Sequence, residues 1–249
     1  MLGLVSISFR SLSPSELISL CRENGLSCIE WGSDVHAPYD DPDRLSEIVE
    51  LQKESGIICS SYGTYFRLGV TSLEELPRYI EAAKALGTRV LRIWGGNKNY
   101  EDLTDEERSA LLAEAKKAAK IAEKAGVTLA FECHNKTFTN RLEGALTLMK
   151  EVSSPSLRMY WQPNQHRSEA ENLAYAEAIS EYTVNLHVFQ WKGKSRFSLH
   201  DGVDEWKRYL SCFKGSEHLL LEFMPDDNPL SLPEEVKALK KIASIDSIS

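Results

Sequence analysis

The chain has 249 residues, of which 42% are hydrophobic and 27% charged, as in a folded domain with a substantial core. Its formal net charge of −8 argues against a protein that binds duplex DNA or RNA, because such proteins normally present a basic face. The five cysteines form no CxxC pair, so we expect a reduced, cytoplasmic protein. Residues 1–10 do not resemble a signal peptide, and no apolar run approaches ~20 residues, so no membrane association is expected.

Short apolar runs alternate with longer segments of helical periodicity along the whole chain. Continuous apolar runs are typical of parallel strands that are buried on both faces. Eight runs are therefore expected to form strands: residues 3–9, 28–33, 58–64, 89–95, 127–132, 157–162, 183–188 and 218–223.

The segments between these runs carry helix boundary signals. Ser13 with Glu16, and Thr104 with Glu107, form the spacing of a capping box at a helix start. The segment 231–234 predicts the start of the last helix. Glycines at four positions are expected to end helices: Gly25, Gly56, Gly87 and Gly126. The tail, residues 245–249, is expected to be frayed.

Eight strand–helix units within 249 residues predict a single (β/α)8 TIM barrel that spans residues 1–249. The alternative is a doubly wound open sheet. Such a sheet usually carries a glycine-rich phosphate loop after its first strand. Residues 8–16 here read SFRSLSPSE and contain no glycine. The barrel is therefore the favoured fold.

Polar side chains stand at the ends of the last four predicted strands. The fifth strand ends on Glu132 and the sixth on Gln162, while the seventh reaches His187 and the eighth reaches Glu222. The active sites of (β/α)8 barrels lie at these carboxyl ends. Residues at equivalent positions on neighbouring strands converge near the barrel axis, so we expect these four to lie together.

Carboxylate, amide and imidazole groups suit a divalent ion such as Mn²⁺, Mg²⁺, Co²⁺ or Zn²⁺. The absence of a thiolate from the set argues against a structural zinc site. The alternative is that each group only caps a strand through hydrogen bonds. Two carboxylates in one cavity without a cation would be unfavourable, however, and this favours a metal bound by Glu132, Gln162, His187 and Glu222.

Five motifs, in order along consecutive strands, carry a resemblance. They read IEWGSDVH (29–36), RVLRIWGG (89–96), LAFECHN (129–135), LHVFQW (186–191) and LLLEF (219–223). In this order they resemble the xylose-isomerase-like barrel superfamily of sugar phosphate isomerases and epimerases, which is related to endonuclease IV. The resemblance spans essentially the whole chain.

The resemblance implies metal ligands of the types Glu, Asp, His and Glu on strands five to eight. Glu132, His187 and Glu222 match this pattern, whereas Gln162 stands where an aspartate is usual. Glutamine still offers a carbonyl oxygen, but the site loses one negative charge. The departure makes a barrel that binds a sugar-like ligand without catalysis a further alternative.

The resemblance also implies a reaction. A metal, Mn²⁺ first among the candidates, polarises the carbonyl of a sugar, sugar phosphate or related polyol derivative and stabilises an enediolate. Glu132 and Glu222 are the implied catalytic residues, one removing a proton and the other returning it. The expected partner is a small sugar-like molecule that can be anionic, and relatives often pair as homo-oligomers through the barrel rim.

Other residues near the strand ends are candidates for substrate binding. His134 follows Glu132 in a Glu-x-His pattern, where it either contacts the substrate or orients Glu132. Arg92 lies inside a strand and needs an anionic partner, which is either a substrate group or a glutamate such as Glu30.

The segment after the seventh strand is basic, and Lys192 and Lys194 in it suit either a substrate phosphate or carboxylate, or a solvated loop. His36, Tyr62 and Trp94 also fall near strand ends, where aromatic rings commonly stack on sugars, although Trp94 equally suits the core.

Two other enzyme classes share the implied scaffold. Lyases that resemble 3-dehydroshikimate dehydratase also carry a Glu-x-His at strand five, and the basic side chains would then meet the substrate carboxylate. Endonuclease IV needs further His and Asp ligands. At the expected places this chain offers Tyr62, Trp94, Gln162 and Gln165, so the nuclease is disfavoured.

Overall fold

The computed structural model describes residues 1–215 and 217–244. Eight parallel strands close into a barrel, in the order β1-β10-β7-β6-β5-β4-β3-β2. The barrel strands are β1 (Leu2–Val5), β2 (Cys28–Gly32), β3 (Ile58–Leu68), β4 (Val90–Gly95), β5 (Thr128–Glu132), β6 (Leu157–Trp161), β7 (Thr183–Val188) and β10 (His218–Leu221).

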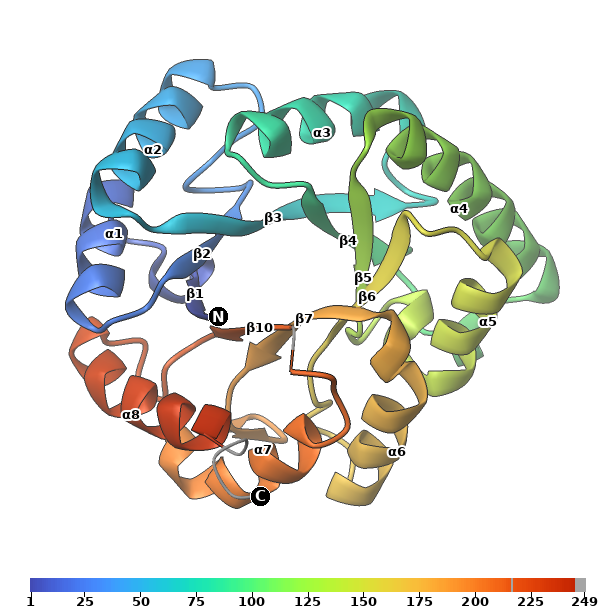
Figure 1. Ribbon diagram of the computed structural model, residues 1–249. Coiled ribbons are helices and arrows are strands. Elements are labelled where there is room, and N and C mark those ends of the chain that lie inside the picture. Colours follow the sequence, from blue (N-terminus) through green and yellow to red (C-terminus); the bar gives the residue numbers. More distant parts are fainter. Residues whose placement is uncertain (216, 245–249) are drawn as a thin grey trace.

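Helices surround this barrel as an outer ring (Figure 1). They are α1 (Pro14–Glu23), α2 (Pro42–Ser55), α3 (Leu76–Ala85), α4 (Asp105–Ala125), α5 (Leu142–Val152), α6 (Glu169–Ile179), α7 (Val203–Leu210) and α8 (Leu232–Ala243). The predicted (β/α)8 barrel is thus confirmed. Within the described ranges, no helix combines the length and the apolar character needed to cross a membrane.

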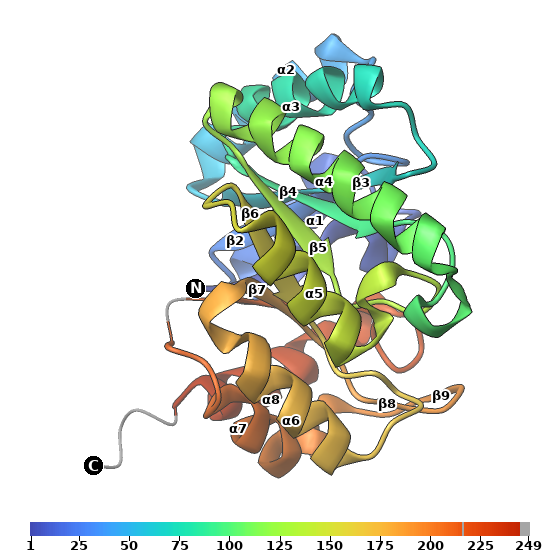
Figure 2. The same cartoon turned by 90° about the vertical axis from the view of Figure 1, so that its right-hand side faces the viewer.

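Several local features differ from the sequence expectation, and β3 continues past the predicted end at residue 64 to Leu68. The first predicted strand, 3–9, is a strand only to Val5, and Ser6–Phe9 form a buried 3-10 helix. The basic segment after β7 forms a hairpin of β8 (Trp191–Lys192) and β9 (Ser195–Arg196). This hairpin extends at the end of the barrel opposite the N-terminus (Figure 2). The tail predicted to be frayed, residues 245–249, lies outside the described residues.

The apolar core occupies two regions. Most buried apolar side chains lie between the strands and the helices, and a smaller cluster contains Val5, Ala130, Tyr160 and Leu220. Side chains alternate between the two faces of a strand, so residues two apart in sequence share a face. Ala130 and Glu132 therefore face the same way on β5, and the smaller cluster lies directly beneath the strand ends.

Local sequence signals fix the first helix. The Ser13 hydroxyl accepts a hydrogen bond from the backbone N–H of Glu16 at 3.3 Å, and the Glu16 carboxylate accepts one from the Ser13 N–H at 2.7 Å. This is the predicted capping box, which satisfies two otherwise unpaired backbone donors. Thr104 and Glu107 form the same arrangement at the start of α4.

We expect Ser13→Ala to lower the free energy of unfolding by about 1 kcal/mol, because it leaves the N–H of Glu16 without its capping acceptor. Ser19→Ala is the matched control, since Ser19 is exposed within the same helix and alanine favours helix more than serine does. Urea unfolding followed by circular dichroism measures both variants. Equal midpoints for the two would contradict a stabilising cap.

Candidate metal centre at the barrel mouth

Four polar side chains meet where β5, β6, β7 and β10 end. Glu132 is the last residue of β5, Gln162 directly follows β6, His187 is the fifth residue of β7, and Glu222 directly follows β10. All four are buried. The structure therefore brings together the four residues that the strand-end pattern selected.

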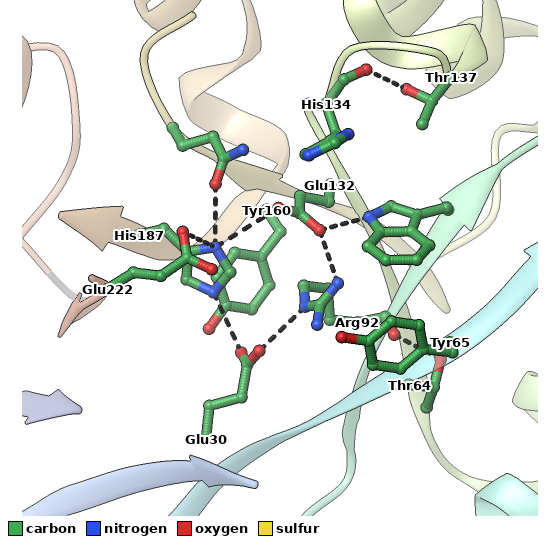
Figure 3. A network of polar contacts seen from close by, with 12 residues as sticks. Glu30, Thr64, Tyr65, Arg92, Glu132, His134, Thr137, Tyr160, His187 and Glu222 are labelled. Carbon is green, nitrogen blue, oxygen red and sulfur yellow. Dashed lines mark hydrogen bonds and ion pairs between the residues drawn. The ribbon is translucent and has the colours of Figure 1, made fainter. Parts of the chain in front are cut away.

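The ring nitrogen Nδ1 of His187 is the centre of this group (Figure 3). It lies 3.0 Å from Oε1 of Gln162, 3.4 Å from Oε2 of Glu222 and 3.6 Å from Oε1 of Glu132. The donor atoms of Glu132, His187 and Glu222 all lie within 4.8 Å of one another. One imidazole nitrogen and three oxygens thus face a common point.

These separations fit a divalent ion. Bonds of about 2.1 Å place neighbouring donors roughly 3.0 Å apart in an octahedral site and roughly 3.5 Å apart in a tetrahedral one. The three distances from Nδ1 span 3.0 to 3.6 Å. The set contains mostly oxygen and no sulfur, which suits Mn²⁺, Mg²⁺, Co²⁺ or catalytic Zn²⁺. The residues present therefore fit the metal that the sequence analysis implied.

The two carboxylates differ in their contacts. Oε2 of Glu132 accepts hydrogen bonds from Nη1 of Arg92 at 2.6 Å and from the indole N–H of Trp94 at 2.5 Å, which leaves Oε1 toward His187. For Glu222, the one ionic or hydrogen-bonding partner of the side chain among the described residues is His187. Glu132 is therefore held firmly on one oxygen, whereas Glu222 is not.

The pKa values follow these contacts. Burial would raise the pKa of Glu132, but the positive charges of Arg92 and His187 outweigh burial and hold it well below its usual range. Burial raises the pKa of Glu222, and the nearby Glu132 charge adds to the increase against the opposing charge of His187. Burial alone would lower the pKa of His187, yet the surrounding carboxylates, Glu222 first, raise it to about 10.

A cavity of about 280 Å³ opens above this group. Its lining includes Glu132, Gln162 and Glu222 together with two predicted substrate-binding residues, His134 and Trp94. The rings of His134 and Trp94 lie 5.7 Å apart by their centroids. The cavity is large enough for a small polar molecule and is lined by both polar and aromatic side chains.

Arg92 also reaches the cavity, but its charge is used within the protein. Its Nε donates to Glu30 at 2.9 Å and its Nη1 donates to Glu132 at 2.6 Å, with all three side chains almost fully buried. Of the two partners left open by the sequence, the structure favours the structural glutamate. Glu30 is the glutamate that was expected from the sequence as a partner of Arg92.

Four predicted substrate-binding residues do not line this cavity. The hydroxyl of Tyr62 donates to the carbonyl of Ala37 at 2.6 Å. The two ring nitrogens of His36 lie 3.1 Å from Ser6 and Leu12, so both have partners within the protein. Lys192 and Lys194 are exposed on the hairpin, where the ammonium of Lys192 lies 3.9 Å from Glu205.

Several lining residues were not among the sequence candidates. Arg10 and Tyr65 face the cavity and contact each other, with Nη2 of Arg10 donating to the Tyr65 hydroxyl at 2.6 Å. Each directly follows a predicted strand, so the strand-end rule could have selected them. Trp191 and Phe223 also line the cavity, with ring centroids 5.3 Å apart. Their pairing depends on the hairpin, which no local sequence pattern indicates.

Known structures share this fold over nearly the whole chain. The probable 3-DHS dehydratase AsbF of Bacillus anthracis, involved in petrobactin synthesis, is 17% identical with a TM-score of 0.78, covering 96% of this chain and 98% of that one. An L-ribulose 3-epimerase is 16% identical with a TM-score of 0.72, covering 97% and 93%. A xylose isomerase-like barrel from Mycobacterium smegmatis in complex with magnesium is 12% identical with a TM-score of 0.67, covering 98% and 96%.

At these identities the likeness shows a common fold. No curated protein matches the sequence significantly. A family model described as xylose isomerase-like TIM barrel matches residues 18–242, which contain all four of the converging side chains. This chain therefore belongs to the xylose isomerase-like TIM barrel family.

Proposed function

We propose that the protein is a metal-dependent isomerase or epimerase of a sugar, sugar phosphate or related polyol derivative. The observation that carries the proposal is the convergence of Glu132, Gln162, His187 and Glu222 beneath a small, polar and aromatic cavity. Both the sugar epimerase and the dehydratase with similar structures support a small-molecule substrate, and they differ in the reaction.

The four converging residues would hold the metal, Mn²⁺ or otherwise Mg²⁺, Co²⁺ or Zn²⁺. When bound, such an ion polarises a substrate carbonyl and makes the neighbouring C–H more acidic. Two carboxylates also supply the charge that a divalent ion requires, and Gln162 supplies a neutral oxygen. His187 supplies its Nδ1 lone pair, which requires a neutral ring.

The carboxylates would divide the remaining work. Glu132 has one oxygen held by Arg92 and Trp94, so it is a poor proton acceptor and a good fixed ligand. Glu222 has no such donors among the described residues and a raised pKa, and both properties favour a group that exchanges protons. We therefore assign the proton removal to Glu222. Because its lowered pKa leaves Glu132 without a proton to give, Glu222 would also return the proton in an isomerisation, and Glu132 would serve as a ligand.

The aromatic and polar rim would orient the substrate. His134 and Trp94 lie on one wall of the cavity, where a ring face suits the apolar face of a sugar and an imidazole suits a hydroxyl. Trp191 and Phe223 form a second aromatic pair on the hairpin side. Such walls exclude water from the reacting carbon and protect an enediolate from side reactions.

Metal binding should release protons. In the metal-free protein at pH 7, His187 is protonated because its pKa is raised to about 10, and an imidazolium offers no lone pair. We expect about one Mn²⁺ per chain and about one proton released from His187 per ion. Calorimetric titration of chelator-treated protein in two buffers of different ionisation enthalpy measures both. Binding with equal heats in both buffers would contradict the protonated histidine.

Glu222→Gln should keep the shape of the site and remove its proton acceptor. We expect solvent-deuterium incorporation into a ketose substrate to fall by about 100-fold or more. The assay uses a panel of ketoses and ketose phosphates with Mn²⁺, followed by proton NMR. Glu54→Gln, an exposed position on α2, is the control and should match the unchanged protein. If the unchanged protein binds metal but exchanges no ketose proton, a sugar-binding barrel without catalysis replaces the proposal.

A dehydratase is the second candidate, and the position of His134 beside Glu132 on the cavity wall favours it. Arg10 and Tyr65 at the rim would then meet a substrate carboxylate. Incubation with 3-dehydroshikimate should produce the ultraviolet absorbance of a catechol. Arg10→Gln should weaken substrate binding by about 10-fold or more, as expected for a lost charged hydrogen bond. Absence of the catechol signal would leave the isomerase proposal as the better one.

A further inference from the structure

Beneath the four converging residues lies a third carboxylate, that of Glu30 on β2, which is fully buried. It does not belong to the group that faces the common point. Instead its two oxygens accept hydrogen bonds from two different directions (Figure 3). Oε1 accepts from Nε of Arg92 at 2.9 Å, and Oε2 lies 3.4 Å from Nε2 of His187.

The contact with His187 determines how the ring can serve the site. A carboxylate accepts hydrogen bonds and does not donate them, so Nε2 of His187 must carry the hydrogen in this contact. The lone pair of a neutral ring then lies on Nδ1, which is the nitrogen that faces Gln162 and Glu222. A second partner on the far nitrogen is the usual means of fixing a ligand imidazole.

The contact with Arg92 extends the effect of Glu30 to a second residue of the site. Arg92 donates from Nε to Glu30 and from Nη1 to Oε2 of Glu132, so the guanidinium links the two carboxylates. Glu132 is thereby held on Oε2, and Oε1 is left toward His187.

Two residues of β3, Ser61 and Gly63, also contact or accommodate the Glu30–Arg92 pair. The hydroxyl of Ser61 donates to Oε2 of Glu30 at 2.9 Å and lies 3.2 Å from the hydroxyl of Tyr160. A Cβ added at Gly63 would lie 2.6 Å from Oε1 of Glu30 and 2.9 Å from Nη2 of Arg92. Only glycine leaves room for the pair at that position.

We propose that Glu30 is a positioning residue for the metal centre, orienting His187 directly and Glu132 through Arg92. This inference rests on the proposed function, because it requires that the site binds a metal. A single carboxylate beneath the site thus fixes the directions in which two ligands on different strands present their donor atoms.

The two-sided contact makes Glu30→Gln a sharp test. Glutamine has one acceptor oxygen and one N–H₂ group, so it can accept from Arg92 or from His187 but not from both. The contact with either Arg92 or His187 is lost, while the volume and shape of the side chain are kept. We expect the affinity for Zn²⁺ to fall by about 10- to 100-fold, the range found when partners of ligand side chains are removed.

Ser61→Ala is the matched control, because it removes a hydrogen bond to Oε2 of Glu30 without changing the contacts of Glu30 with Arg92 and His187. We expect its Zn²⁺ affinity to stay within about 3-fold of the unchanged protein, although it removes the buried contacts of Ser61 with both Glu30 and Tyr160. Competitive chelator titration measures the affinities, and circular dichroism checks that each variant is folded.

A spectroscopic measurement on the unchanged protein makes the test independent of variant folding. In the Zn²⁺-loaded protein, ¹H–¹⁵N correlation spectra should show His187 with hydrogen on Nε2 and a slowly exchanging proton there. Glu30→Gln should shift that signal or speed its exchange, whereas Ser61→Ala should leave its exchange slow.

Equal Zn²⁺ affinity in Glu30→Gln and the unchanged protein, or a His187 ring with hydrogen on Nδ1, would overturn the positioning role alone. Failure of the unchanged protein to bind any metal would overturn the proposed function, and this inference with it. The two failures are therefore distinguishable.

Discussion

Glu30, Glu132 and Glu222 place three carboxylates inside the barrel, and among the described residues Arg92 is the one guanidinium that contacts any of them. Burial penalises charge unless opposite charges are close. With a neutral His187 the interior therefore holds two uncompensated negative charges. Protonation of His187, whose pKa is raised to about 10, compensates one of these two charges. The proposed divalent ion would compensate both charges and would allow the ring to be neutral.

The closed barrel determines from which side these buried carboxylates can be reached. Parallel register places Glu132 beside Tyr160 on the next strand and Leu220 beside His187, so the polar groups border the apolar cluster that contains Tyr160 and Leu220. The side chains of this cluster, among them Val5 and Ala130, are buried, so no water reaches the carboxylates from that side. A cavity opens beside Glu132 and Glu222. Under the proposed function, a cation and a substrate would therefore bind at the same end of the barrel.

Much of this arrangement could be predicted from the sequence, because both the strands and their end positions have local signals. Alternating apolar runs located Glu132, His187 and Glu222 without knowledge of any contact. Tyr62 lies between Ser61 and Gly63, which both approach Glu30 in the structure, so its side chain faces the other way on the strand. The position of Tyr62 along the strand is apparent from the sequence. The face of the strand on which its side chain lies is not, and that face points away from the cavity.

Other features depend on contacts between distant segments and had no local signal. The turn of residues 6–9 into a 3-10 helix aligns Ser6 with His36, whose ring is then occupied by the protein. The hairpin that carries Lys192 pairs only two residues per strand, which is too short for a periodic pattern. The backbone N–H of Gly193 in this hairpin donates to the carbonyl of Gln165 in the preceding loop at 2.8 Å, a contact between segments that are distant in the sequence. Lys192 and Lys194 therefore do not line the cavity, although they lie close to it in the sequence.

Gln162 becomes understandable when the whole buried charge is considered rather than the ligand set alone. An aspartate is the ligand implied at this position by the family resemblance, and it would add a carboxylate beside Glu132 and Glu222. Because Glu30 already balances Arg92, that carboxylate would leave a metal-loaded interior with a net negative charge. The amide keeps an oxygen 3.0 Å from Nδ1 of His187 and adds no charge. A neutral centre repels an anionic substrate or a developing enediolate less than a negative one does, so the amide fits proton abstraction as well as metal binding.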